Sequence, residues 1–348
     1  MSVNKEMKYI KGMLHSLRKK ELRHLGDMLK ENEVVTDDLT LWSDTKKILD
    51  VSDIDKTQWI FKALEERKKQ TIEILSVWEY KRFYKYSSIF KVNDVQNNII
   101  NPILSAPTIN QNQKLYKDFK KPALLEEKEY FFLKYNIKYT GFDPIDEKKR
   151  YIKYPVVIIM YKNMNIIEVR FDGISSNFNR EKFSYLEVVK FAKQWLQNNT
   201  NVEFEFINLD KIVQDIIDNE EENRVVIYGQ MMNMASGSSA QLDIGKSDKY
   251  ILPFIGELKN MLSNHQKEFD DAPKIKELLE DFIKEKEELS DYPWIILRWV
   301  HKEHKSKNKD VKFIFNYHDT DICLLHHYSN ASIGMERMNY VTKYLIQN

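Results

Sequence analysis

The sequence predicts an α+β fold: a basic N-terminal helical region followed by a larger domain with a mainly antiparallel sheet. Three observations predict this class. Apolar residues recur at helical spacing within residues 5–86, strand-like alternation begins near residue 129, and several later strands adjoin as hairpins. With 348 residues and 42% hydrophobic side chains, the chain is long enough for two packed domains.

Two long periodic segments indicate a small N-terminal helical bundle. Residues 5–31 repeat leucine and isoleucine at spacings of three to five, and residues 55–86 read as one long helix. Thr36 with Asp37 and Asp38 resembles a helix start, and residues 44–50 read as a short helix.

A change of composition marks the expected domain boundary. Residues 91–122 are rich in Asn and Gln and are interrupted by three prolines. We therefore expect a basic helical domain over residues 1–90, a linker over 91–122 and an α+β domain over 123–348.

Alternation and turn chemistry place the later elements. Strands are expected at residues 129–140, 151–161, 166–171, 202–207, 224–232, 294–300, 311–317 and 322–328, with a further short strand ending at Ile244. Helices are expected at residues 182–198, 209–217, 249–269, 273–289 and 331–346. Adjoining strands favour an antiparallel sheet over a doubly wound parallel one.

The composition also bounds the cellular setting. Cys323 is the one cysteine, so an intramolecular disulfide is excluded and a reducing, cytoplasmic compartment is favoured. No apolar run approaches the ~18 residues of a membrane helix, and no membrane partner is expected. Abundant Lys, Asn and Ile with few Gly and Pro suggest an AT-rich, bacterial or phage-like genome.

Charge is distributed unevenly, which points to nucleic acid as a partner. Residues 1–121 carry 23 Lys and Arg against 17 Asp and Glu. Basic side chains interleaved with tyrosines suit phosphate contact and base stacking. A solvated helix surface is the simpler alternative explanation. The candidate phosphate contacts are Arg18, Lys19, Arg23, Lys46, Lys47, Lys68, Lys81, Arg82 and Lys85.

Helix geometry sharpens that prediction. If residues 55–86 form one helix, Lys81 and Lys85 are four residues apart and share a face, whereas Lys68 lies on another. Cations at a helix C-terminus also complement the macrodipole, which offers a purely structural reason for them.

A second hypothesis is a protein-interaction subunit of a larger assembly, such as a defence or mobile-element system. Residues 200–290 carry 10 Lys and Arg against 20 Asp and Glu. The acidic helices over 249–289 would then bind a protein partner or mediate self-association.

A third hypothesis is a metal-dependent nuclease. Glu168, Arg170 and Asp172 project to one face of a strand, and Glu203 and Glu205 share a face of another. Magnesium nucleases gather carboxylates and a cation in this way. Simple alternation, with polar residues facing water, explains the same pattern.

Five histidines near Cys323 form the last candidate constellation, which contains His301, His304, His318, His326 and His327. Cys323 and His326 would face opposite sides of a strand, which disfavours a shared metal. No zinc, P-loop, Rossmann, kinase or hydrolase motif is present, so neither a catalytic residue, nor a metal, nor a cofactor is predicted.

Overall fold

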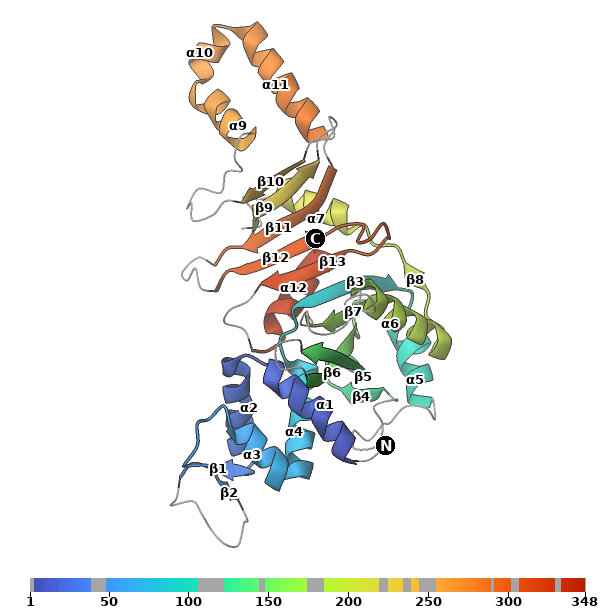
Figure 1. The fold of residues 1–348 in the computed structure, drawn as a ribbon. Coiled ribbons are helices and arrows are strands. Elements are labelled where there is room, and N and C mark those ends of the chain that lie inside the picture. Colours follow the sequence, from blue (N-terminus) through green and yellow to red (C-terminus); the bar gives the residue numbers. More distant parts are fainter. Residues whose placement is uncertain are drawn as a thin grey trace. The chain divides into compact units, whose positions relative to one another are not determined.

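The computed structural model describes residues 3–38, 48–105, 122–143, 148–173, 185–218, 225–233, 239–243, 255–288, 291–301, 307–328 and 333–347. The chain forms two compact units. Unit 1 comprises Met1–Ile207 and Ser332–Met338, and unit 2 comprises Asn208–Ala331 and Asn339–Asn348. Both units combine helices with antiparallel strands, so the α+β class is confirmed (Figure 1).

Helices are concentrated at the start of unit 1. The described helices of that unit are α1 (Val3–Ser16), α2 (Lys19–Glu31), α3 (Trp59–Glu66), α4 (Lys68–Lys81), the π-helix η2 (Gln96–Ile100), α5 (Asn101–Ser105) and α6 (Tyr185–Asn199). Those of unit 2 are α7 (Leu209–Asp218), α9 (Ile255–Asn264), α10 (Gln266–Asp270) and α11 (Pro273–Glu288). Helix α12 (Glu336–Gln347) begins in unit 1 and ends in unit 2. No helix among the described residues is long and apolar enough to cross a membrane.

The strands of unit 1 form an antiparallel sheet in the order β4-β5-β6-β7-β3, and β8 pairs with the far edge of β3. Their bounds are β3 (Tyr86–Val92), β4 (Ala123–Glu126), β5 (Tyr130–Asp143), β6 (Lys148–Tyr161), β7 (Ile166–Phe171) and β8 (Phe204–Glu205). The predicted hairpin between β6 and β7 is confirmed, and Asn165 in its turn has a positive φ of 49°.

The sheet of unit 2 runs in the order β10-β9-β11-β12-β13, also antiparallel. Its strands are β9 (Val225–Asn233), β10 (Ser239–Asp243), β11 (Asp291–Trp299), β12 (Lys309–Ile314) and β13 (Leu324–Tyr328). The two predicted hairpins, β9–β10 and β12–β13, are both present because alternation and turn residues agree there.

The N-terminal helices differ from the sequence prediction at three places. The expected helix over 5–31 breaks at Arg18, whose backbone is extended (φ −71°, ψ 150°). The expected helix over 55–86 breaks at Arg67 and ends at Lys81. Near the helices expected at 36 and at 44–50, the described residues form a two-stranded parallel ladder, β1 (Val35–Thr36) with β2 (Leu49–Asp50), while residues 39–47 lie outside the described residues.

These helices pack directly against the sheet of unit 1. Leucines and tryptophans of α1 to α4 form one core cluster that also contains Ile152 of β6. Helix α1 approaches β6 so closely that a Cβ on Gly12 would lie 1.7 Å from the Tyr151 carbonyl oxygen. Glycine is therefore required at this crossing, and the helical region and the sheet share one core (Figure 1).

Helices α4 and α6 cover opposite faces of this sheet. Lys134 and Tyr135 are successive residues of β5 and so point to opposite faces. Lys134 contacts Glu79 of α4, whereas the Tyr135 hydroxyl donates a hydrogen bond to the Val188 carbonyl of α6 at 3.3 Å. The sheet is thus buried on both sides.

Buried charged side chains join α4 to the sheet. Glu79 and Lys134 are fully buried, and Lys153 is 2% exposed. The Lys134 Nζ donates to Glu79 Oε2 at 2.8 Å and to the Ser76 carbonyl at 3.0 Å, and it lies 4.2 Å from the Tyr80 ring centroid. Lys153 Nζ donates to the second Glu79 oxygen. One carboxylate of α4 therefore binds two strands.

We expect Glu79→Gln to destabilise unit 1 by roughly 3–5 kcal/mol, because it leaves two buried ammonium groups without their counter-charge. Urea denaturation followed by circular dichroism measures this loss. Glu73→Gln on the exposed face of the same helix is the matched control and should change stability by less than ~0.5 kcal/mol. Equal effects of the two substitutions would contradict the role given to Glu79.

The same site predicts a pH dependence. Burial lowers the pKa of Lys134 to about 8, although Glu79 opposes the shift. Between pH 8 and 10 the unfolded chain then holds this proton while the folded chain releases it, so stability rises with pH. We expect wild type to gain about 2 kcal/mol over this range relative to Lys134→Met. Parallel pH profiles for the two proteins would show that Lys134 does not titrate there.

Candidate nucleic-acid interface

Arg18 stands at the break between α1 and α2, and Glu21 holds it there. The Arg18 backbone N–H donates to Glu21 Oε2 at 3.0 Å, and its Nε donates to the same oxygen at 2.8 Å. The guanidinium also lies 6.0 Å from the Phe83 ring centroid, and 43% of the side chain remains exposed. Arg18 is thus fixed in place while its outer edge reaches solvent.

Lys20 lies within electrostatic range of two other cations, Arg18 and Arg337. Partial burial lowers the pKa of Lys20, and the nearby charges of Arg18 and then Arg337 contribute to the same shift, while Glu21 opposes it. Arg337 comes from the first turn of α12, more than 300 residues away in the chain, and belongs to unit 1. Like charges therefore converge at the N-terminal end of α2.

Lys19 and Arg23 extend this positive region along α2. They are four residues apart on the helix, so they share a face, and both are exposed. Neither makes a hydrogen bond or ion pair with another described residue, although both contribute to lowering the pKa of Asp55. We define the basic cluster as the cations that meet here: Arg18, Lys19, Lys20, Arg23 and Arg337.

The other exposed candidates do not converge on this cluster as a group. Lys68 and Lys81 lie at opposite ends of α4, so their Cα atoms are roughly 20 Å apart. Lys81 forms an ion pair with Glu127. The expected common helix face of Lys81 and Lys85 is wrong, because the helix ends at Lys81 and Lys85 lies in the segment that leads to β3.

Arg82 is removed from the candidate phosphate contacts. Only 3% of its side chain is exposed, and its guanidinium pairs with Asp172 and lies 3.8 Å from Glu21. It also packs 4.2 Å from the Tyr84 ring centroid. The neighbouring charge of Asp172 helps to raise its pKa despite burial, so it stays a buried cation. Lys46 and Lys47 lie outside the described residues.

The carboxylates of the nuclease hypothesis are engaged with cations. Glu168 and Arg170 are fully buried and pair at 2.6 Å, while Asp172 holds Arg82 and accepts the Lys85 backbone N–H at 3.1 Å. The alternative explanation, that polar residues face water, is wrong for Glu168 and Arg170, because β7 is buried on both faces. Glu203 and Glu205 are exposed beside β3, and the Lys91 ammonium pairs with Glu205 at 2.9 Å.

The described histidines of this cluster, His301, His318, His326 and His327, do not form a ligand set. Among the residues that the structure describes, no three His, Cys, Asp or Glu side chains are placed to hold a metal ion. His326 and His327 are adjacent on β13, so they point to opposite faces, and His327 is the buried one. His304 lies outside the described residues.

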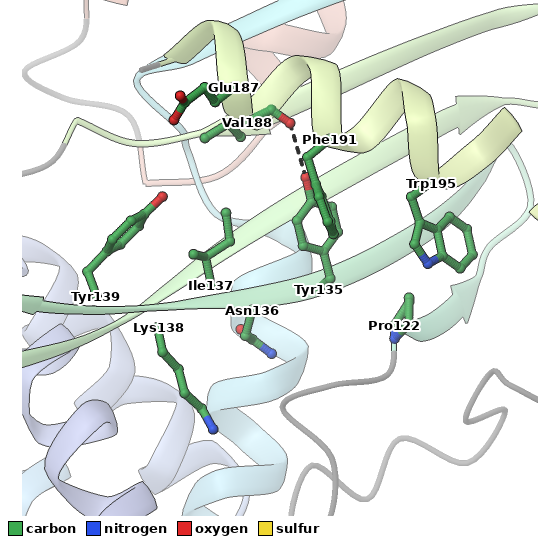
Figure 2. Close-up of a pocket in the computed structure, with 10 residues that line it drawn as sticks. All are labelled: Pro122, Tyr135, Asn136, Ile137, Lys138, Tyr139, Glu187, Val188, Phe191 and Trp195. Atoms are coloured by element: carbon green, nitrogen blue, oxygen red, sulfur yellow. Dashed lines mark hydrogen bonds between the residues drawn. The ribbon is translucent and has the colours of Figure 1, made fainter. Parts of the chain in front are cut away.

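An apolar groove in unit 1 was not predicted from the sequence. It lies between β5 and α6 and has a volume of about 510 Å³. Figure 2 shows Tyr135, Ile137 and Tyr139 pointing from β5 toward α6, while Asn136 and Lys138 point away. The lining residues are Pro122, Tyr135, Asn136, Ile137, Lys138, Tyr139, Glu187, Val188, Phe191 and Trp195.

The sequence does contain the groove's two halves. Tyr135, Ile137 and Tyr139 alternate along one strand, and Phe191 and Trp195 are four residues apart on one helix. The sequence does not show that this strand face packs against this helix, because that is a tertiary contact between segments some 50 residues apart.

Comparison of the chain with protein-family models, with curated proteins and with solved structures found no match in any of the three.

Proposed function

We propose that the chain is a non-catalytic nucleic-acid-binding protein whose basic cluster contacts the phosphate backbone. The observation that carries this proposal is the convergence of Arg18, Lys20 and Arg337 at the start of α2. Like charges brought this close repel one another, and an anion bound between them would relieve that repulsion.

Helix geometry adds to the electrostatic case. The N-terminal end of α2 carries the positive end of the macrodipole, where cations are normally disfavoured and phosphates are favoured. Glu21 is the one acidic residue in that first turn, and it is already bonded to Arg18. Lys19 and Arg23 continue the positive charge along the exposed face, as a phosphate-tracking surface requires.

Lys19 and Arg23 are exposed, so substituting them tests the proposal without disturbing the core. We expect the double substitution Lys19→Gln/Arg23→Gln to weaken the binding of a DNA duplex of about 20 base pairs roughly ten-fold. It should also reduce the slope of the logarithm of the binding constant against the logarithm of the salt concentration by about two. Fluorescence anisotropy at several salt concentrations measures both quantities.

The matched control is Lys267→Gln/Lys307→Gln, which removes two exposed lysines from unit 2. It should leave affinity and salt slope unchanged. If the wild type shows no binding at low salt, or if both double variants weaken it equally, the basic cluster is not the contact surface.

A second candidate function is self-association through α11, and one observation favours it. Ile275, Leu278 and Phe282 are 58%, 70% and 37% exposed and recur at spacings of three and four, which places them on one helix face. Ile283 is turned away from this stripe and is buried on the side of α9. The stripe is therefore an uncovered apolar face on an acidic helix.

The charges beside the stripe favour an antiparallel pair of α11 helices. Lys274 and Asp281 are seven residues apart, so they lie on the same flank of the helix. Antiparallel pairing places Lys274 against Asp281 of the partner subunit, whereas parallel pairing places like charges together. Three apolar side chains fall well short of the ~800 Å² per partner of a stable complex, so association would be weak.

We expect concentration-dependent dimerisation in the range of about 10–100 μM, measured by sedimentation velocity. Leu278→Gln should abolish it, while Leu104→Gln, which alters an exposed leucine of α5, should not. A wild-type protein that stays monomeric at the highest of these concentrations would exclude this surface as a dimer contact.

A further inference from the structure

The groove between β5 and α6 is lined by aromatic rings, of which Phe191 is exposed, Tyr139 and Trp195 are half-buried and Tyr135 is buried. Half of the Phe191 side chain is exposed, and its ring centroid lies 5.1 Å from that of Tyr135. The Tyr135 hydroxyl already donates to the Val188 carbonyl, so its proton is engaged within the protein. A volume of about 510 Å³ falls within the range of small-molecule sites.

Among the residues that the structure describes, one charged side chain is directed at this groove. Glu187 lies at the N-terminal turn of α6, is exposed, and makes no ion pair with another described residue. It is near enough to Tyr139 to contribute to raising the pKa of that phenol, after the larger effect of burial. Figure 2 shows both side chains at the same end of the groove.

The nearby lysines do not neutralise Glu187. Lys138 points to the opposite side of β5, and its Nζ lies 5.7 Å from the Tyr9 ring centroid (Figure 2). Lys193 on α6 is directed at the Phe90 and Phe204 rings, each 4.8 Å from its Nζ. Lys190 follows Glu187 by three residues without forming an ion pair with it. The groove therefore combines electron-rich ring faces with one carboxylate that pairs with no cation of the described residues.

We propose that this groove binds a small organic cation with an apolar or aromatic body. The cationic head would lie between Tyr139 and Glu187, where the ring quadrupole and the carboxylate both attract positive charge. The apolar body would extend along Ile137 toward Trp195. This inference is independent of the basic cluster, which attracts anions.

Benzyltrimethylammonium is a suitable probe, and benzyl alcohol is its uncharged counterpart. Titration calorimetry on the full chain should show saturable binding of the cation at least roughly three-fold tighter than of the alcohol. Glu187→Gln should remove this preference and leave the affinity for the alcohol unchanged. Phe191→Ala should weaken the binding of both ligands, because it removes the aromatic ring that both would contact.

Glu73→Gln is the control, since it neutralises an exposed carboxylate on α4, across the sheet from the groove. It should leave both affinities unchanged. The proposal is overturned if neither probe binds saturably up to millimolar concentration, which is also the outcome expected if another part of the chain fills the groove. It is overturned equally if cation and alcohol bind alike, or if Glu187→Gln has no effect on the cation.

Discussion

The bond of Glu79 to Lys134 and Lys153 is the interaction on which the rest of unit 1 depends. Burial would raise the pKa of Glu79, but the two lysines beside it hold that pKa below its ordinary value, so the carboxylate stays charged. A charge in this setting tolerates little displacement, because each partner would be left buried and unpaired. The two ion pairs of Glu79 therefore fix the position of α4 on the sheet. Arg82, one residue beyond α4, repeats the arrangement with Asp172 and lies beside Glu21, which orients Arg18.

The sequence predicted most elements whose pattern is local. The β6–β7 and β12–β13 hairpins follow from alternation and turn residues, and α6 and α7 follow from helical periodicity. The predictions that are wrong concern places where tertiary contacts determine the local structure. Arg18 interrupts an otherwise helical pattern because Glu21 and Phe83 stabilise its extended backbone. The short parallel ladder of β1 and β2 pairs Thr36, which resembles a helix start, with the end of a segment that reads as helical, so the pairing outweighs the local preference.

The candidate site was predictable only in part, for the same reason. Lys19 and Arg23 are exposed as their polar helix face implies. Arg82 belongs to a basic segment in which a solvent-exposed cation would be expected. Nothing in that segment indicates that Arg82 is buried in an ion pair with Asp172, 90 residues away. Arg337 joins the cluster from the opposite end of the chain. A regional charge count shows how many basic residues a segment carries, whereas the tertiary structure determines which of these residues lie close together.

The buried charges hold α4 and the sheet together as one network. A double-mutant cycle between Glu79→Gln and Lys153→Met tests it most directly, with unfolding free energies measured in urea. Removing both groups should cost less than the sum of the single losses, with a coupling of about 2 kcal/mol or more. Additivity within about 0.5 kcal/mol would contradict the account, because the two side chains would then stabilise the fold independently.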